Sequence, residues 1–489
     1  MTTNRSEELL SQSMHSSTRK RVLGAHGSDP FTASPRCLSA RLPMIANQMV
    51  SLLSEQDAAE FLSAWSGSKL IVGSLCSGTD VCVDAFRGLA KVGNFVVEHM
   101  LSCEISPANQ RWILQQCSPP PTILYEDVLE FARGHGYDVK NERVAQFVPC
   151  DMLFIGFSCK DLSIMNYHSA NNRSCVRTKS LRTGGTLASS MSYIASVKPR
   201  WVFLENVTAI EYVDKDCGAS NADEIVRLFA DLGYCMAHTV MDARQHGAAH
   251  RRTRWWACAF RVNDSAAITV QQDQAMKPLK DKYLQVLDDI MMKPVKLNQV
   301  LMDEDSEDLS AWQTARFAEL EEPGCRALSS WRRVPDLDQK WRDMHKEIFR
   351  AEGLRYPPEL PMIYNQKELR MLTLLSPRSQ DIVAFHDLKF GRVTEGEEII
   401  DVGQSLGRVS VAQDAIPCTL PKGTPWARRR FRIVEPNETL ACQGLPRKTF
   451  QELENFTRSE LQSLAGNAFS GNTALACSLA ALVAFKDIE

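Results

Sequence analysis

The chain has 489 residues, 44% of them hydrophobic, which is enough for two or three domains around a substantial core. Its formal net charge of -3 excludes a general affinity for polyanions, so any nucleic-acid surface must be a local basic patch. The 15 cysteines stand at irregular spacings without a CxxC pair, which argues against a zinc ribbon or a disulfide framework and favours a reducing intracellular compartment.

The N-terminal residues 1–45 are polar, Ser-rich and without hydrophobic periodicity, so we predict a disordered tail. Within it, the basic run from Thr18 to Arg21 is a candidate nuclear import signal, and an organelle transit peptide stays open as an alternative. No uninterrupted apolar run looks long enough to cross a bilayer, so we expect no membrane partner. We expect an intracellular protein, nuclear if the cell is eukaryotic.

From residue 46 onward, helical patterns alternate with short apolar strands, which is typical of an α/β fold with a doubly wound, mostly parallel sheet. Residues 49–65 have helical spacing, with Ser54 and Asp57 placed as a capping box. The strand 69–75 leads into the turn CSGTD at residues 76–80 and then a helix. A strand, a Gly-containing turn and a helix form the cofactor-binding start of such a sheet.

Acidic residues follow the next two predicted strands. Residues 95–103 end in Glu104, and residues 123–124 are followed shortly by Asp127. An acid after the second strand of such a sheet binds ribose hydroxyls, and the next one is placed to accept a hydrogen bond from an adenine amino group. Either acid alone could be a solvated strand end, but the two in this order favour a cofactor site.

Cys159 follows a short apolar run at residues 151–156 that has the pattern of a buried parallel strand. Open α/β sheets place their ligands at this end of a strand. The adjacent Lys160 would favour the thiolate, which is the nucleophilic form. Because most free cysteines simply pack in cores, Cys159 becomes a candidate nucleophile only through the residues that accompany it.

The next apolar strand, residues 199–204, ends in Glu205-Asn206-Val207. A carboxylate at the tip of a strand beside the one that carries Cys159 would be partly desolvated and able to donate a proton near neutrality. A capping or structural carboxylate is the alternative reading of Glu205.

Two further strands, residues 235–241 and 254–260, are expected to form a hairpin at the edge of the sheet. Between them, Arg252 and Arg254 point the same way in an extended chain. That orientation suits a fork of donors for a phosphate or a base carbonyl, although three arginines in four residues could also form a solvated face.

Residues 265–427 carry no recognisable motif, with helical patterns near 279–292, 311–321 and 331–349 and a strand-like pattern near 392–411. We assign them to a smaller mixed target-recognition domain by position. The catalytic part then comprises residues 46–264 and 428–489. Candidate loops for nucleic-acid contact are residues 173–182 and 426–432, the second with Trp426 and Phe431 for base stacking. An exposed basic strand is an equally open alternative for 426–432.

With these features in order, the chain resembles the cytosine carbon-5 methyltransferases. The nucleophile motif is GFSCKDLS at residues 156–163, ENV stands at 205–207 and HRRTR at 250–254. RIVEPNETLACQGLP at residues 432–446 resembles the ninth motif, and AGNA at 465–468 matches the last. The resemblance covers residues 69–260 and 428–485 and implies a Rossmann-like methyltransferase fold with a C-terminal helix that returns to the cofactor site.

The resemblance also implies roles for individual residues. It implies S-adenosylmethionine as cofactor, bound by Cys76, Ser77, Gly78, Thr79, Glu104, Ile105, Asp127, Val128, Leu187, Asn467 and Ala468. The implied catalytic residues are Cys159, Glu205, Arg252 and Arg254. The implied substrate-binding residues are Phe157, Ser163 and Asn206, with no metal.

The chemistry implied is methyl transfer to carbon 5 of cytosine in double-stranded DNA, with the target base flipped out of the helix. Cys159 would add to carbon 6 while Glu205 protonates ring nitrogen 3. An RNA substrate, in particular transfer RNA, and a catalytically weak relative that binds nucleic acid and regulates remain alternatives. A nicotinamide oxidoreductase is disfavoured, because the first turn has one Gly where GxGxxG needs three.

Four positions depart from the family pattern. Ser158 replaces a Pro that stiffens the nucleophile turn, and Lys160 replaces a Gln. Asp80 stands where a Gly lets the cofactor approach, so it would either pair with the cofactor's ammonium group or crowd it. His250 replaces the Gln that precedes the arginines.

Overall fold

A computed structural model describes residues 41–163, 166, 169, 172–262, 266–321 and 335–488, with side chains from 339 onward in the last range. The predicted tail up to residue 40 and the basic run from Thr18 to Arg21 lie outside the described residues. Helix α1 (Arg41–Leu52) begins inside the range 1–45 that we assigned to the tail, because its apolar side chains pack into the core. Folded structure therefore starts earlier than predicted.

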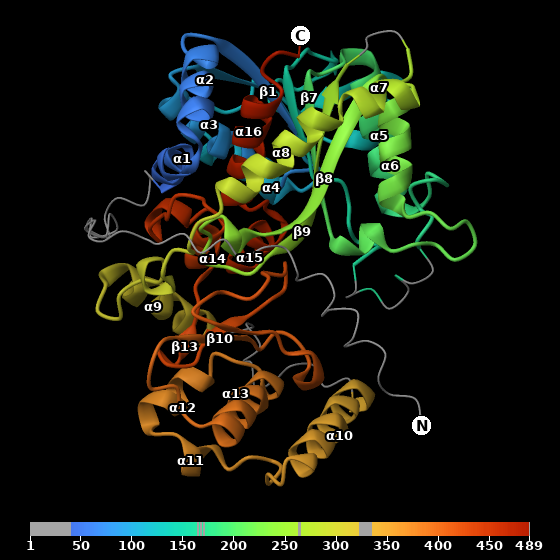
Figure 1. The fold of residues 1–489 in the computed structure, drawn as a ribbon. Helices are drawn as coiled ribbons and strands as arrows, with labels where there is room; N and C mark the ends of the chain where they lie inside the picture. Colours follow the sequence, from blue (N-terminus) through green and yellow to red (C-terminus); the bar gives the residue numbers. More distant parts are fainter. Residues whose placement is uncertain are drawn as a thin grey trace. The chain divides into compact units, whose positions relative to one another are not determined.

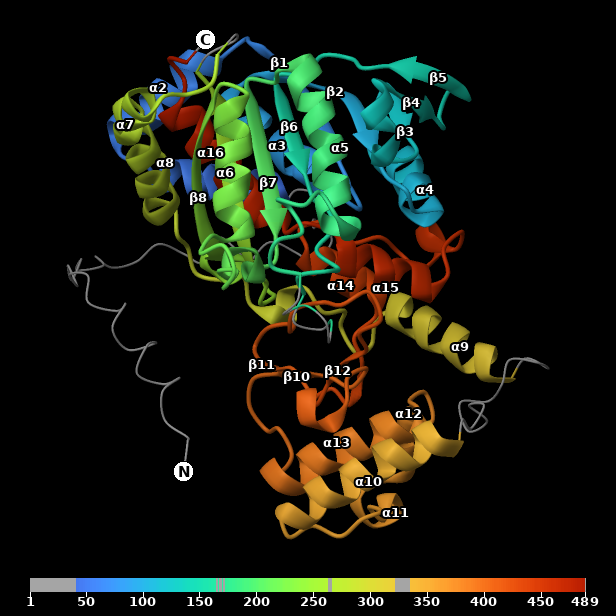
Figure 2. The ribbon, with the colours of Figure 1, turned by 90° about the vertical axis from the view of Figure 1, so that its right-hand side faces the viewer.

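A large mixed sheet organises the part of the chain that the structure describes (Figures 1 and 2). Its strand order is β5-β4-β3-β2-β1-β6-β7-β9-β8. The five neighbouring strands β3, β2, β1, β6 and β7 are mutually parallel. The strands are β1 (Lys69–Leu75), β2 (Val96–Cys103), β3 (Ile123–Tyr125), β4 (His135–Asp138), β5 (Arg143–Gln146), β6 (Met152–Ile155), β7 (Trp201–Asn206), β8 (Tyr234–Asp242) and β9 (Thr253–Arg261). The order reverses between β1 and β6, the place where open sheets bind ligands.

Helices cover both faces of this sheet. Figure 2 shows α5 and α6 in front of the strands and α3 and α16 behind them. The first core contains α1, α2 (Glu55–Trp65), α3 (Val81–Gly93), α4 (Pro107–Gln116), α8 (Lys277–Asp289) and α16 (Gly471–Ala484). The second contains α5 (Leu181–Val197), α6 (Asn221–Asp231) and η2 (Val128–Arg133). The doubly wound α/β prediction is confirmed.

Local sequence signals explain several of these boundaries. The Ser54 hydroxyl accepts the Asp57 N–H and so caps the start of α2, although the reciprocal bond of the predicted capping box is not seen among the described contacts. The helix expected over 49–65 is in fact two helices. The predicted edge hairpin is present as β8 and β9, with β9 also antiparallel to β7. The β4–β5 hairpin was not predicted, because its strands are short and largely polar and lack an apolar run.

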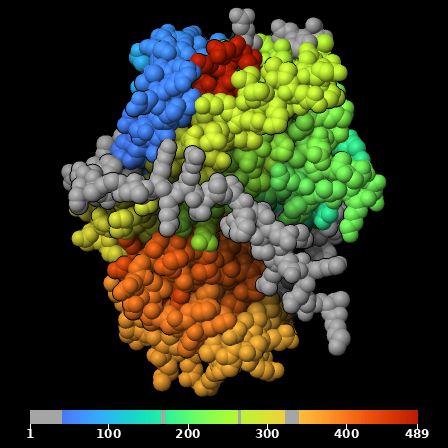
Figure 3. Space-filling model, viewed as in Figure 1, coloured from blue at the N-terminus to red at the C-terminus, as the bar shows by residue number. Residues whose placement is uncertain are grey.

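The C-terminal segment returns to the sheet and fills the first core. Helix α15 (Arg458–Asn467) is followed by α16, in which every residue is buried. Figure 3 shows the red C-terminal residues set between the blue N-terminal helices and yellow-green residues. By length and composition the run Arg458–Ala484 is apolar enough to cross a membrane, contrary to our expectation, but 94% of its most apolar window is buried in the protein, as in a core helix.

The region predicted for target recognition divides between two cores. Helix α8 and part of α9 (Glu307–Glu321) pack in the first core, so this part of the range 265–427 lies with the part predicted to be catalytic. A third core joins α10 (Pro335–Ala351), α12 (Gln366–Leu372) and α13 (Pro377–Phe390) to a small antiparallel sheet. That sheet consists of β10 (Glu398–Asp401), β11 (Val411–Gln413), β12 (Pro425–Ala427) and β13 (Arg432–Ile433). Because β12 pairs with β13, the sheet extends across the predicted boundary at 427/428.

The remaining elements are short. They are η4 (Thr208–Glu211), η5 (Ala243–Gln245), α7 (Val270–Ala275), η6 (Leu297–Gln299), α11 (Leu360–Ile363), η8 (Leu406–Arg408), α14 (Pro436–Cys442) and η9 (Gln451–Leu453).

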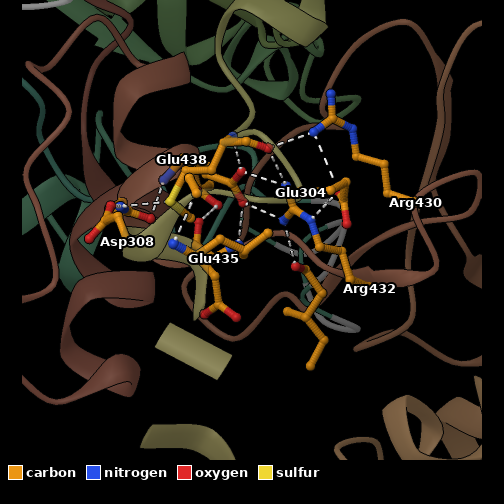
Figure 4. Close-up of polar contacts among 12 residues, drawn as sticks. Glu304, Asp308, Arg430, Arg432, Glu435 and Glu438 are labelled. Atoms are coloured by element: carbon orange, nitrogen blue, oxygen red, sulfur yellow. Dashed lines mark hydrogen bonds and ion pairs between the residues drawn. The ribbon is translucent and has the colours of Figure 1, made fainter. Parts of the chain in front are cut away.

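A buried ion-pair cluster fixes the start of the ninth motif (Figure 4). Arg432 donates from both terminal nitrogens to Glu438, each at 2.8 Å, and from Nε to Glu304 at 3.0 Å. Trp426 and Phe431 lie in the third core, at 0% and 8% exposure. The prediction that these aromatic side chains stack on bases is wrong, because the tight β12–β13 turn directs them inward.

Candidate active site

The four predicted catalytic residues converge at one edge of the sheet. Cys159 follows β6, Glu205 lies near the end of β7, Arg252 immediately precedes β9, and Arg254 is its second residue. Glu205 Oε1 is 3.2 Å from Arg254 Nε and 3.6 Å from Arg252 Nη2. The two arginines therefore reach the same carboxylate, as their predicted common orientation requires.

The Glu205 carboxylate is buried at 8% exposure and incompletely satisfied. Within the described part of the chain, Oε1 has no aligned hydrogen bond, although both arginines lie close enough for an ion pair. A buried carboxylate oxygen without a hydrogen bond is costly, which favours a binding partner that completes it. Glu205 is thus available to a polar ligand.

Cys159 is held mainly as a thiol. Burial raises the pKa of the Cys159 thiol, the Glu205 carboxylate raises it further, and Arg254 and Arg252 oppose both effects. The sequence-based expectation that Lys160 favours the thiolate is not supported, because Lys160 is exposed and the opposing positive charges come from the arginines. Ionisation of Cys159 therefore depends on the charge state of its neighbours in the site.

The turn that presents Cys159 is fixed without the family's proline. The Ser158 N–H donates to Thr186 Oγ1 at 3.2 Å, a contact that a Pro could not make. At Gly156, a Cβ would lie 2.6 Å from the Cys76 carbonyl oxygen, so only Gly allows this approach to the first turn. Ser158 therefore compensates for the missing ring through a hydrogen bond to α5.

Asn206 and Ser163, both predicted to bind substrate, form hydrogen bonds to the backbone of the turn that carries Cys159. Asn206 is fully buried, donates from Nδ2 to the Phe157 carbonyl at 3.0 Å and accepts the Val207 N–H at 2.9 Å. The Ser163 N–H donates to the Cys159 carbonyl at 2.9 Å. Asn206 thus orients the Phe157 carbonyl, and the role of Ser163 toward substrate stays a prediction.

The first turn, residues 76–80, packs directly against the end of α15. A Cβ on Gly78 would lie 2.8 Å from the Asn467 carbonyl oxygen, and the Gly78 φ of +78° also favours glycine. The Gly78 N–H donates to Glu104 Oε2 at 3.0 Å. The first and last motifs therefore meet next to the acid predicted to bind ribose.

Asp80, at the end of the first turn, is enclosed by serine side chains. It is fully buried, and its carboxylate accepts hydrogen bonds from the hydroxyls of Ser74, Ser77 and Ser102, two of them at 2.5 Å. His99 Nε2 lies 2.8 Å from Ser102 Oγ and 3.5 Å from Asp80 Oδ2, and burial lowers the pKa of His99. The Asp80 carboxylate therefore stabilises the first turn through three serines, and its relation to a cofactor ammonium group stays a prediction.

The residues predicted for the cofactor fit S-adenosylmethionine in three respects. Burial raises the pKa of Glu104 to about 7, and its carboxylate also accepts the Ser106 N–H at 3.3 Å. Ile105 is 64% exposed immediately after Glu104, an apolar surface suited to an adenine ring. Thr79 Oγ1 is buried and, among the residues with a described environment, without a hydrogen-bond partner.

The other predicted cofactor residues line or support the same place. Asp127 accepts the Leu129 N–H at 2.9 Å, which caps η2. Val128, Leu187 and Ala468 are buried, so they support the site rather than present polar groups to it. Cys76 is partly exposed, and burial and the nearby Glu104 and Asp127 carboxylates raise its pKa.

His250, the fourth departure, is a buried structural residue. Its Nδ1 lies 2.6 Å from the Cys442 carbonyl oxygen, and burial, assisted by Arg252, lowers its pKa to about 3. The ring is therefore neutral at physiological pH. His250 ties the arginine segment to α14 without adding a third positive charge.

Sequence reasoning missed Cys418, which lies in the range 265–427 that we assigned to target recognition. Arg254 Nη2 donates to Cys418 Sγ at 3.4 Å. No motif or periodicity marks this residue in the sequence, and only the folded chain brings it to the arginines.

The chain was then compared with known proteins. A sequence model of the family described as C-5 cytosine-specific DNA methylase matches residues 122–478. The DNA (cytosine-5-)-methyltransferase DMT5 of Cryptococcus neoformans is 25% identical over 482 residues, which cover 92% of this chain and 19% of that protein. DMT5 of Verticillium dahliae is 21% identical over 492 residues, covering 86% and 20%. The chain therefore spans about a fifth of the length of the curated relatives it matches.

Among solved structures, the Entamoeba histolytica methyltransferase EhMeth superposes with a TM-score of 0.42 at 10% identity, covering 86% of this chain and 99% of that one. The family match extends over most of the chain and contains Cys159, Glu205 and both arginines. The resemblance seen in the sequence is thus confirmed: the protein belongs to the C-5 cytosine-specific DNA methylase family.

Proposed function

We propose that this protein transfers a methyl group from S-adenosylmethionine to carbon 5 of cytosine in DNA. The observation that carries the proposal is the convergence of Cys159, Glu205, Arg252 and Arg254 beside the first turn, with Gly156 closely approaching Cys76. Family membership supports the reaction class, as do two relatives named DNA (cytosine-5-)-methyltransferase.

S-adenosylmethionine, when bound, supplies an electrophilic methyl group. Glu104 would accept hydrogen bonds from its ribose, and Asp127 would accept one from its adenine amino group. The exposed Ile105 side chain would cover the adenine face, and the Gly78 turn would allow the close approach of the backbone. These residues would orient the bound cofactor toward Cys159, because Gly156, just before the nucleophile turn, lies close to Cys76 in the first turn.

Carbon 5 of cytosine is a poor nucleophile, so the ring must first be activated by covalent addition. Cys159 adds through sulfur to carbon 6 while Glu205 delivers a proton to ring nitrogen 3. The two steps are coupled, because the Glu205 carboxylate is the nearby charge that most raises the Cys159 pKa. While Glu205 is protonated, its negative charge no longer opposes the Cys159 thiolate, and the positive charges of Arg254 and Arg252 favour that thiolate.

The remaining groups of the site orient the base. Arg254 and Arg252 hold the cytosine carbonyl oxygen or the flanking phosphate, and the Phe157 carbonyl keeps a lone pair for the cytosine amino group while it accepts from Asn206. Loss of the carbon-5 proton and departure of Cys159 complete the turnover. The target atom is inaccessible inside a duplex, so the base must be flipped out.

Covalent trapping tests the proposal. The protein is incubated with S-adenosylmethionine and DNA or transfer RNA that carries 5-fluorocytosine, which blocks the final proton loss; Cys159→Ser serves as the control. An adduct with DNA at Cys159 supports the proposal. An adduct with RNA alone selects an RNA methyltransferase, and no adduct despite measurable cofactor binding indicates a non-catalytic relative.

A DNA substrate also leads us to propose a nuclear location in a eukaryotic cell. Removal of the basic run from Thr18 to Arg21 in a fluorescently tagged chain tests whether this segment directs import. Nuclear signal that persists unchanged without the run assigns import to another segment.

A further inference from the structure

We infer that Cys418 is a positioning residue for Arg254: its sulfur accepts one guanidinium hydrogen bond so that Nε stays directed at Glu205. This inference rests on the proposed function for its consequence in catalysis, but the contact itself can be measured without any turnover. Cys418 lies outside every motif that carries the family resemblance, so neither the sequence pattern nor the proposed mechanism assigns it a role.

The three nitrogens of Arg254 have three different partners. Nη1 donates to the Thr253 carbonyl at 2.8 Å, Nη2 donates to Cys418 Sγ at 3.4 Å, and Nε lies 3.2 Å from Glu205 Oε1. A planar guanidinium group held at both terminal nitrogens has a fixed plane, and that plane determines where Nε points. Loss of the Cys418 contact leaves Nη2 free and lets the group rotate away from Glu205.

Backbone contacts fix Cys418 to the segment that carries the arginines. The Ile416 N–H donates to the Ala249 carbonyl at 2.9 Å, and the Arg251 N–H donates to the Ile416 carbonyl at 2.8 Å. Cys418 is two residues after Ile416, which takes part in both bonds, and Arg254 is three residues after Arg251. The loop therefore presents the sulfur from a nearly constant position relative to Arg254.

The same loop is also held from the opposite side. Gln462 Nε2 in α15 donates to the Leu420 carbonyl at 3.2 Å, and a Cβ on Gly466 would lie 2.3 Å from the Pro421 nitrogen. The chain segment that closes the recognition sheet is thus clamped between α15 and the arginine segment. This arrangement joins the recognition side of the protein to a catalytic arginine through Cys418.

The charges around Cys418 favour its anionic form. Burial raises the pKa of the Cys418 thiol, but Arg254 and Arg252 outweigh burial and the Glu205 carboxylate, so that its pKa is lowered overall. Among the described thiols with a shifted pKa, every other one is raised, including that of Cys159. A hydrogen bond from a guanidinium group to a thiolate is stronger than one to a neutral thiol.

The first test measures the contact directly. Full-length protein is alkylated with iodoacetamide between pH 6 and 9.5, and the midpoint of each site's rate is read by peptide mass spectrometry. We expect a lower midpoint for Cys418 than for Cys159, and a higher Cys418 midpoint in Arg254→Gln. A Cys418 midpoint at or above that of Cys159, or one that Arg254→Gln leaves unchanged, overturns the inference.

The second test measures the consequence for turnover. We expect Cys418→Ala to lower kcat about tenfold, as for the loss of one charge-assisted hydrogen bond, with cofactor Kd and DNA KM within about twofold. Cys418→Ser keeps an acceptor at this position and should recover most of the lost rate. Cys217→Ser removes an exposed thiol that donates to the Ala219 carbonyl, and it is the matched control.

The outcomes separate this inference from the proposed function. If Cys418→Ala and Cys418→Ser lower kcat equally, or if either acts only through KM or thermal unfolding, the positioning role is overturned. If the wild-type protein methylates no nucleic acid but its two thiols titrate in the expected order, the Arg254–Cys418 contact is supported and the proposed function fails.

Discussion

Two buried carboxylates, one after β1 and one near the end of β7, differ in how their charge is satisfied. Asp80, at the end of the first turn, accepts three serine hydroxyls and is fully buried. Glu205, at the nucleophile, faces two arginines, yet its Oε1 lacks an aligned hydrogen bond within the described structure. The first arrangement is complete without a ligand, whereas the second needs one. A completed carboxylate braces a turn, and an incomplete one can take part in chemistry.

The largest effect is expected at the nucleophile of the incomplete site. Cys159→Ser should abolish turnover, because a serine hydroxyl ionises far less readily than a thiol in the same place. Cofactor binding, measured by calorimetry, should be unchanged because the first turn is intact. Full activity in Cys159→Ser would show that the proposed mechanism is wrong.

Glu205→Gln should lower kcat by about 10²–10⁴, the range for loss of a general acid. The same substitution should make Cys159 easier to ionise: removal of the carboxylate charge should lower the Cys159 pKa, because Glu205 raises it. The rate of thiol alkylation at Cys159 against pH measures this shift. If the pH midpoint of Cys159 alkylation is unchanged or higher in Glu205→Gln, Glu205 does not control the ionisation of Cys159.

Asp80→Asn should act on stability rather than chemistry. An amide cannot accept from three serines as a carboxylate does, so we expect a loss of about 1–3 kcal/mol in the free energy of unfolding. Cofactor affinity should weaken, while kcat at saturating cofactor should be nearly retained. If Asp80→Asn loses most of its kcat while its urea unfolding is unchanged, then Asp80, like Glu205, acts in the reaction rather than in stability.

The smallest effect concerns Glu104. Its folded pKa of about 7 exceeds the ordinary carboxyl value, so its contribution to stability is present below that ordinary value and is lost as pH rises through about 7. Ribose hydroxyls donate best to the carboxylate, so cofactor affinity should rise a few-fold between about pH 6 and 8. Glu104→Gln should bind more weakly and without this pH dependence, and a pH-dependent mutant would contradict the assignment.

Sequence reasoning located the parts of the fold that depend on local pattern. The strands that end at Cys103, Ile155 and Asn206 follow from short apolar runs, and the family motifs place the catalytic residues at their ends. Arg252 and Arg254 were correctly expected to face the same way, since that follows from the alternation of an extended chain.

What sequence reasoning could not supply depends on tertiary packing. The direction of the Asp80 carboxylate is set by serines on two strands, and the burial of Trp426 is set by a hairpin with no strong local signal. Cys418 is the clearest case, because its partner is 164 residues away in the chain. Hydrophobic periodicity carries no information about a contact of that separation.

The contact between Gly78 and Asn467 has a consequence for protein synthesis. The chain emerges from the ribosome from its N-terminus, so the first turn is made long before the helix end that packs on it. Truncation between β13 and α15 would keep every sheet strand in the chain, but it would remove the buried α16 from the first core and the Asn467 contact from the first turn. Premature termination late in the reading frame should therefore yield protein fragments that fail to retain cofactor, even though every predicted catalytic residue has been translated.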